Sequence, residues 1–205
     1  AVRLNALLLA STLLFAVLAG LWGPWDQPAG LDVWPAMGNA RALWTGDWES
    51  WHPWRWPLHA ALVGAGPLMP TAHAVSIASI AGAGLFAAWR ARQLAGPIAG
   101  VMALLVVLAS PDMLAFARLC TAYPLLTLLL TASLVRGRLQ PLALLLLGMV
   151  DARGAVLGLA ALAGLGLEKD WRGLALGGLG LGVGSALPWL LPVDLVPLWT
   201  QAELQ

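Results

Sequence analysis

Long apolar runs separated by short polar segments dominate the chain. The runs lie at about residues 4–22, 71–89, 94–110, 119–135, 139–167 and 173–191. A helix that crosses a bilayer needs roughly 17–25 mostly apolar residues, and nearly all of these runs fall in that range. The pattern therefore predicts an all-α protein, a polytopic bundle of transmembrane helices that forms a single domain over residues 1–205.

The run 139–167 is longer than the others and is interrupted by Asp151 and Arg153. Reading it as two helices gives seven spans. With the N-terminus in the cytoplasm, seven of the eleven basic residues then fall on the inner side, but only two of the ten acids, Glu168 and Asp170. The inner bases are Arg3, Arg90, Arg92, Arg136, Arg138, Lys169 and Arg172. This distribution follows the positive-inside rule, whereas one long helix would place Lys169 and Arg172 outside.

The outer loop between the first two spans, residues 23–57, is rich in tryptophan. Eight of the twelve tryptophans lie between Trp22 and Trp56. Tryptophan is enriched at the level of lipid headgroups, where one end of its side chain can be apolar and the other hydrated. The loop also holds most of the polar chemistry of the chain: Asp26, Asp32, Arg41, Asp47, Glu49, His52 and Arg55. We expect it to lie against the outer face of the bilayer.

Part of this loop has a helical apolar pattern. Apolar residues recur at spacings of three and four, at Val33, Met37, Ala40, Trp44 and Trp48. The pattern predicts an amphipathic helix over residues 33–50 that lies in the membrane plane. The polar residues Asn39, Arg41, Thr45 and Asp47 fall largely off the apolar face.

Prolines and glycines indicate where helices break and where they pack. Residues 58–70 are apolar but contain Pro67 and Pro70, which predicts an interfacial segment before the second span. Glycines four residues apart let membrane helices approach closely. Such pairs occur at Gly96/Gly100 and Gly154/Gly158, and further glycines crowd the last span at 173, 177, 178, 180, 182 and 184.

Composition supports the membrane assignment. Hydrophobic residues make up 60% of the chain and charged residues 10%, against about 25% charged in a soluble domain. The mean hydropathy is +0.81, so lipid is the expected partner. A net charge of +1 argues against a nucleic-acid partner. The single cysteine, Cys120, excludes a disulfide framework and a thiolate metal site within the chain, and the histidines show no metal-ligand spacing.

Two groups of polar residues are candidates for chemistry at the outer face. Asp32 precedes the predicted helix, where it can act as an N-cap or as a general base towards a hydroxyl acceptor, and the two roles are compatible. In the next outer turn, Asp112 and Tyr123 can be a helix cap and an interfacial tyrosine. Alternatively they flank Arg118, a permanently charged donor suited to a phosphate.

Other polar residues have structural interpretations. Asp151 and Arg153 suit a local ion pair in a tight outer turn. His52 and His59 are expected in the interfacial belt, and His73 is expected to be a core histidine whose hydrogen bonds are satisfied.

The order of motifs resembles the N-terminal module of the GT-C membrane glycosyltransferases, which include relatives of protein O-mannosyltransferase and lipid A aminoarabinose transferase. The first block is an anchor helix, Asp32, Asn39-Ala40-Arg41-Ala42-Leu43, Gly46-Asp47-Trp48, His52-Pro53 and Pro57-Leu58. The second block is Ser110-Pro111, Arg118 and Tyr123-Pro124-Leu125-Leu126. The matches cover roughly residues 1–140 and depend on order and spacing.

The resemblance implies a seven-helix module that transfers a sugar from a polyprenyl-phosphate donor at the outer face of a bacterial inner membrane. It implies that Asp32 is the catalytic base. Arg118, with Asp112, Tyr123 and Arg41, would then bind the substrates. The resemblance leaves the identity of any cofactor open, and a divalent metal ion is one candidate.

Two other functions compete with this one. Val33 stands where many members of the family have a second acid, which favours a non-catalytic subunit that serves as scaffold or assembly component of a larger membrane complex. A transporter is a weaker alternative, because no charged residue is clearly placed in mid-membrane.

Overall fold

The computed structural model describes residues 2–21, 33–45, 57–150 and 152–187, and within them every regular element is an α-helix. The elements are α1 (Val2–Leu21), α2 (Val33–Thr45), α3 (Pro57–Gly64), α4 (Leu68–Ala95), α5 (Pro97–Ala109), α6 (Pro111–Ala117), α7 (Tyr123–Ser133), α8 (Leu139–Gly148), α9 (Ala152–Leu167) and α10 (Trp171–Ala186). The all-α prediction is confirmed for these residues.

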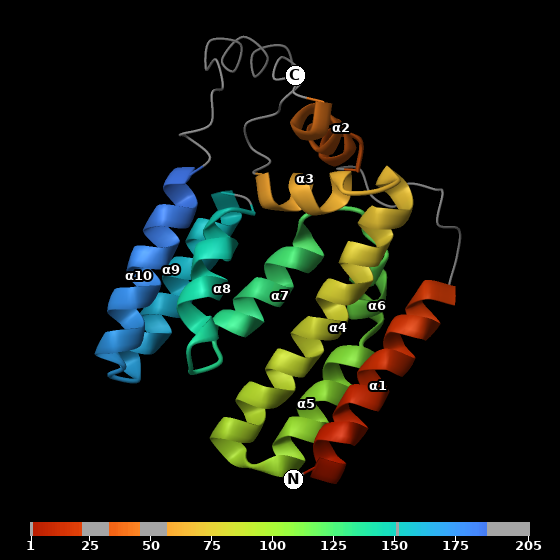
Figure 1. The fold of residues 1–205 in the computed structure, drawn as a ribbon. Coiled ribbons are helices and arrows are strands. Elements are labelled where there is room, and N and C mark those ends of the chain that lie inside the picture. The colour runs from red at the N-terminus through yellow and green to blue at the C-terminus, as the bar shows by residue number, and fades with distance from the viewer. Residues whose placement is uncertain (1, 22–32, 46–56, 151, 188–205) are drawn as a thin grey trace.

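Most of the helices run up and down between two ends of the molecule (Figure 1). Helices α1, α4, α5, α7, α8, α9 and α10 alternate in direction along the chain, while α2 and α3 lie across one end. We call this the α3 end. The turns α4–α5, α7–α8 and α9–α10 lie towards the opposite end, which we call the basic end.

Helix lengths support fewer membrane spans than the sequence predicts. Among the described residues, α4 alone is long and apolar enough to cross a bilayer, and the bent pair α5–α6 brings the number to two. A core helix of a soluble protein can satisfy the same criterion. Helices α7 and α8, with 11 and 10 residues, are shorter than the predicted spans. The bundle of seven spans therefore stays a prediction.

Helix α4 begins earlier and ends later than the predicted second span. It starts at Leu68 rather than near residue 71, and it includes Pro70. The first N–H groups of a helix have no partner inside the helix, so proline in the first turn costs no hydrogen bond. The helix continues to Ala95, which places Arg90 and Arg92 within it rather than beyond its end.

In contrast to α4, the helices at the third and fourth predicted spans are shorter than expected. Gly96, with a φ of 88°, separates α4 from α5. Helix α5 ends at Ala109, and the chain bends by 64° into the short helix α6. The Ser110 side chain caps α6 by accepting a hydrogen bond from the Met113 N–H, 3.5 Å away. Helix α7 then begins at Tyr123 rather than near residue 119.

The division of residues 139–167 into two helices is confirmed by α8 and α9. Helix α10 packs directly on α8 because glycines line the contact. A Cβ added to Gly184 would lie 2.0 Å from the Leu145 carbonyl oxygen, and one added to Gly180 would lie 2.6 Å from that of Pro141. Gly178 and Gly182 have no neighbouring atom within 4 Å of such a Cβ. Only part of the glycine pattern therefore serves packing within the described chain.

The predicted helix over residues 33–50 is observed as α2, from Val33 to Thr45, and residues beyond it lie outside the described ranges. Ala40 is buried, as its apolar position predicts. Trp44 is exposed, and its indole N–H donates to the Ala61 carbonyl oxygen of α3 at 3.2 Å. Asn39 is buried, although its polarity placed it off the apolar face. Helix α2 thus packs against α3 on the rest of the molecule.

The three predicted inner turns meet at the basic end. Both carboxylate oxygens of Glu168, after α9, are used: Oε1 pairs with Arg90 of α4, and Oε2 accepts from Arg136, after α7, at 2.8 and 3.0 Å. Arg136 lowers the pKa of the Glu168 carboxyl by hydrogen bonding, partial burial opposes the shift, and Arg90 adds to it. The shared placement of these turns is what the charge distribution in the sequence predicts.

Candidate functional site

The loop 118–122 at the α3 end is anchored on three sides. The buried Ser76 hydroxyl of α4 donates to the Leu119 carbonyl oxygen. At the end of α6, the Arg118 N–H donates to the Ala115 carbonyl oxygen and the Leu119 N–H donates to that of Phe116, at 3.1 and 3.0 Å. The Cys120 side chain is buried beneath α2 and α3 in a cluster with Ala40 and Val63. The backbone that carries Arg118 is therefore held in place.

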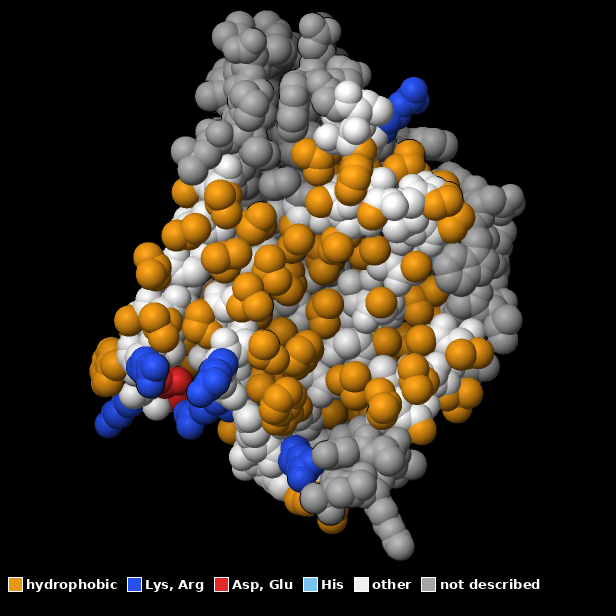
Figure 2. Space-filling model, in the orientation of Figure 1, with side chains coloured by type: hydrophobic (Ala, Val, Ile, Leu, Met, Phe, Trp, Pro, Cys, Tyr) orange, Lys and Arg blue, Asp and Glu red, His pale blue; other side chains and the backbone are white. Residues whose placement is uncertain are grey.

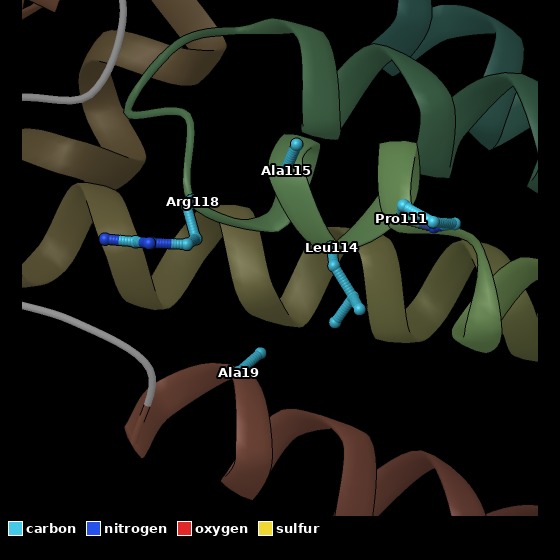
Figure 3. A pocket seen from close by; sticks show the side chains of 5 residues that line it. All are labelled: Ala19, Pro111, Leu114, Ala115 and Arg118. Atoms are coloured by element: carbon cyan, nitrogen blue, oxygen red, sulfur yellow. The ribbon is translucent and has the colours of Figure 1, made fainter.

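A groove of about 270 Å³ lies between α1 and α6 (Figure 3). The described residues that line it are Ala19, Pro111, Leu114, Ala115 and Arg118. Leu114 points from α6 towards Ala19 on α1, and the Arg118 side chain extends from the end of α6 (Figure 3). Apolar walls with an arginine among the lining residues suit an amphiphile whose tail lies in the groove and whose anionic head lies near Arg118.

Tyr123 joins α6, α7 and α9. The Arg153 guanidinium carbon lies 4.4 Å from the centre of the Tyr123 ring, and Arg153 also donates a hydrogen bond to the Tyr123 hydroxyl. On the other side, the Phe116 ring meets Tyr123 edge to face, with ring centres 6.4 Å apart. An exposed cation–π contact contributes about 0.5–1 kcal/mol. Tyr123 is thus half-buried and held by contacts from α6 and α9.

The other predicted site residues are not brought into the groove. Asp112 is exposed in the first turn of α6, where Ser110 is the cap, so the capping role predicted for Asp112 is wrong. No ion pair joins Asp112 to Arg118 in the described part of the chain. Arg41 is exposed on α2 and is not among the residues that line the groove.

The predicted catalytic base, Asp32, lies outside the described residues, as do Asp47, His52 and Asp151. His59 is only 4% exposed, so its predicted place in the interfacial belt is wrong. His73 is buried in α4, as expected of a core histidine. Within the described ranges, no three His, Cys, Asp or Glu side chains form a group that could hold a metal ion.

Two residues that support the site could not be identified from the sequence. Ser76 lies inside an apolar helix, where a lone serine is common and gives no signal of its own. Arg153 suited a local pair with Asp151, yet it reaches Tyr123, thirty residues away. Only the packing of α9 against α7 shows that contact.

Comparisons with family models, with curated proteins and with solved structures found no match to this chain.

Proposed function

We propose that the chain is a GT-C-like membrane glycosyltransferase that uses a polyprenyl-phosphate sugar donor. The observation that carries the proposal is the groove between α1 and α6, with apolar walls and Arg118 among its lining residues. A polyprenyl phosphate has the same two parts, a long apolar tail and an anionic head. Arginine suits the head because its guanidinium is always charged and can donate two parallel hydrogen bonds.

In the proposed reaction, Asp32 accepts the proton of an acceptor hydroxyl while the hydroxyl oxygen attacks the anomeric carbon of the sugar. The bond between that carbon and the phosphate oxygen breaks, and the polyprenyl phosphate leaves with the electron pair. Arg118 stabilises the negative charge that develops on the leaving phosphate. Tyr123, held by Arg153 and Phe116, lies in the segment that follows Arg118 and serves as a positioning residue.

We further propose that α1, α4, α5–α6, α7, α8, α9 and α10 cross the membrane, with the basic end in the cytoplasm. The meeting of Arg90, Arg136 and Glu168 at one end supports this orientation, because positive residues are retained on the cytoplasmic side. The shorter helices can be accommodated by local thinning of the bilayer.

Cysteine labelling in sealed vesicles tests the orientation. We expect Lys169→Cys and Thr45→Cys, both at exposed positions, to react with membrane-impermeant reagents from opposite sides. The native Cys120 is buried and serves as the unlabelled control. Labelling of both variants from one side would contradict the seven-span arrangement.

Variants of Arg118 test the donor site. Arg118→Lys keeps the charge but loses the paired donors, and hydrogen bonds to charged groups contribute about 1.5–3 kcal/mol. We expect kcat/KM for a polyprenyl-phosphate donor to fall about 10- to 100-fold, and further in Arg118→Gln. Leu114→Ala should weaken the binding of donors with long tails more than the binding of donors with short tails. Equal activity of Arg118→Gln and the wild type would refute this role.

Asp32→Asn tests the base. Asparagine caps a helix about as well as aspartate, so the fold should persist. Loss of a general base should reduce kcat by about 10²- to 10⁴-fold. Asp47→Asn, in the same Trp-rich stretch, is the matched control and should cost far less. Full sugar transfer by Asp32→Asn with normal membrane insertion would remove Asp32 from the mechanism.

A scaffold function is the second candidate, and α10 supports it. Gly178 and Gly182, one helical turn apart, present a surface with open space around it, and small residues at this spacing favour helix association in membranes. A wild-type chain that transfers no sugar and copurifies with a larger membrane complex would favour this function over catalysis.

A further inference from the structure

The basic end gathers cations from three turns. The bases are Arg90, Arg92, Arg136, Arg138, Lys169 and Arg172, and the acids of these turns are Glu168 and Asp170. Figure 2 shows Lys and Arg side chains grouped around an acidic one at this end, below α8 and α10. The turns touch, since a Cβ added to Gly173 of α10 would lie 3.0 Å from the Gln140 side-chain oxygen of α8.

Both acids are already engaged within the protein. Glu168 binds Arg90 and Arg136. Asp170 caps α10, its Oδ1 accepting from the Gly173 N–H at 2.9 Å. Arg138, Lys169 and Arg172 are exposed and form no ion pair with a carboxylate of the described residues. These three cations therefore have no carboxylate partner among the described residues.

The cations of the α9–α10 turn are carried by a backbone whose conformation is fixed by hydrogen bonds. Lys169 has a φ of 57°, its N–H donates to the Gly166 carbonyl oxygen at 3.1 Å, and the Asp170 N–H donates to that of Leu165 at 3.0 Å. These bonds satisfy the last carbonyls of α9 and fix the direction of the chain into α10. Lys169 and Arg172 are therefore presented from a preorganised turn.

Large apolar side chains border the same cations. Leu167 is 87% exposed and Trp171 is 67% exposed, directly flanking the α9–α10 turn, and Leu139 is exposed next to Arg138. A free phosphate would make no favourable contact with these apolar side chains. An anionic lipid would, because its acyl chains cover the leucines and the indole of Trp171 suits the headgroup level.

We propose that the three cations form a docking surface for anionic phospholipid headgroups of the phosphatidylglycerol class. Arg138, Lys169 and Arg172 bind the phosphodiester, and Leu167, Leu139 and Trp171 contact the adjoining lipid. The surface requires that the chain be embedded in a bilayer. It does not require glycosyl transfer, and it lies at the opposite end from the groove at Arg118.

The test compares lipid selectivity in membranes. The full chain is reconstituted in phosphatidylcholine bilayers, and the association of spin-labelled phosphatidylglycerol relative to spin-labelled phosphatidylcholine is measured by electron paramagnetic resonance. The test variant is Arg138→Gln/Lys169→Gln/Arg172→Gln. The matched control is Arg138→Lys/Lys169→Arg/Arg172→Lys, which keeps all three charges.

We expect the preference for phosphatidylglycerol to fall at least about fivefold in the neutral variant. This lower bound is the contribution of a single basic residue near an anionic surface, and the variant removes three. The charge-preserving control should keep it, and added salt should weaken it in the wild type. If the neutral triple variant fails to insert, Lys169→Gln alone should show a smaller loss.

Two results would overturn the proposal. One is an unchanged lipid preference in the inserted neutral variant. The other is displacement of the labelled lipid by inorganic phosphate at comparable concentration, which would identify a soluble anion as the ligand. Neither result would bear on sugar transfer, so this proposal and the proposed enzyme activity fail separately.

Discussion

Two buried hydroxyls near the α3 end show how differently similar polar groups can contribute. Ser76 donates to the Leu119 carbonyl oxygen and so ties α4 to the loop that carries Arg118. Thr121 is 3% exposed, and its Oγ1 has no hydrogen-bond partner among the described residues. A buried hydroxyl that makes its bond contributes modestly, whereas one without a bond costs the free energy of its desolvation.

This difference predicts opposite effects of two conservative substitutions. Ser76→Ala should lower the free energy of unfolding by about 1–3 kcal/mol, because the Leu119 carbonyl loses its buried donor. Thr121→Val removes an unpaired hydroxyl at nearly constant shape and should be neutral or stabilising. Thermal unfolding in one detergent or lipid checks both. Destabilisation by Thr121→Val comparable with that by Ser76→Ala would show that the threonine hydroxyl has a partner.

At the scale of elements, the contact between α8 and α10 depends on which face of α10 each glycine occupies. The Gly180 and Gly184 positions meet backbone carbonyls of α8, while Gly178 and Gly182 meet open space. Spacing alone cannot separate the two sets, since every one of these glycines has another four or fewer residues away. The separation follows from the rotation of α10 about its axis, which packing sets.

Alanine at these positions should therefore have opposite consequences. Gly184→Ala places a methyl group 2.0 Å from the Leu145 carbonyl oxygen, so the helices must separate, at a cost of about 1–3 kcal/mol. The methyl group added by Gly182→Ala meets no atom within 4 Å, so this substitution should raise helix stability by up to about 1 kcal/mol. Thermal unfolding measures both. Strong destabilisation by Gly182→Ala would instead indicate a helix docked on that face, as the scaffold function expects.

At the scale of the whole molecule, one carboxylate connects three helices distant in sequence. Glu168 holds Arg90 at the end of α4 and Arg136 after α7, so the basic ends of α4, α7 and α9 are tied together. The hydrogen bond from Arg136, opposed by burial and reinforced by the charge of Arg90, lowers the pKa of Glu168 below its ordinary value of 4.5. The ionised form is therefore favoured by folding.

The sign of this shift sets the pH dependence. A lowered pKa contributes stability that is fully present above pH 4.5, and that contribution is lost as the pH falls through the lower pKa of the folded state. We therefore expect the contribution of Glu168 to the melting temperature to be constant near neutral pH and to decrease below pH 4.5. Glu168→Gln should lower the melting temperature at pH 7 and flatten its acid dependence. An identical acid profile in both proteins would exclude Glu168 as the cause.

The sequence by itself determined the features that depend on local pattern and on charge. Apolar runs broken by polar residues identified the helices, the pair Asp151 and Arg153 placed the break between α8 and α9, and the bases marked three turns that share one end. It also singled out Arg118. These features could be predicted because each depends on neighbouring residues or on the sum of charges in a turn.

Only the tertiary structure decided which residues meet. Arg118 lines a groove with Ala19, about a hundred residues away in the chain, and Arg153 reaches Tyr123 rather than forming only a local contact. It also decided that His59 and Asn39 are buried, and that α10 packs with Gly180 and Gly184 rather than with Gly178 and Gly182. Such contacts depend on the rotation and tilt of whole helices, which result from packing over many side chains and have no signature in a local pattern.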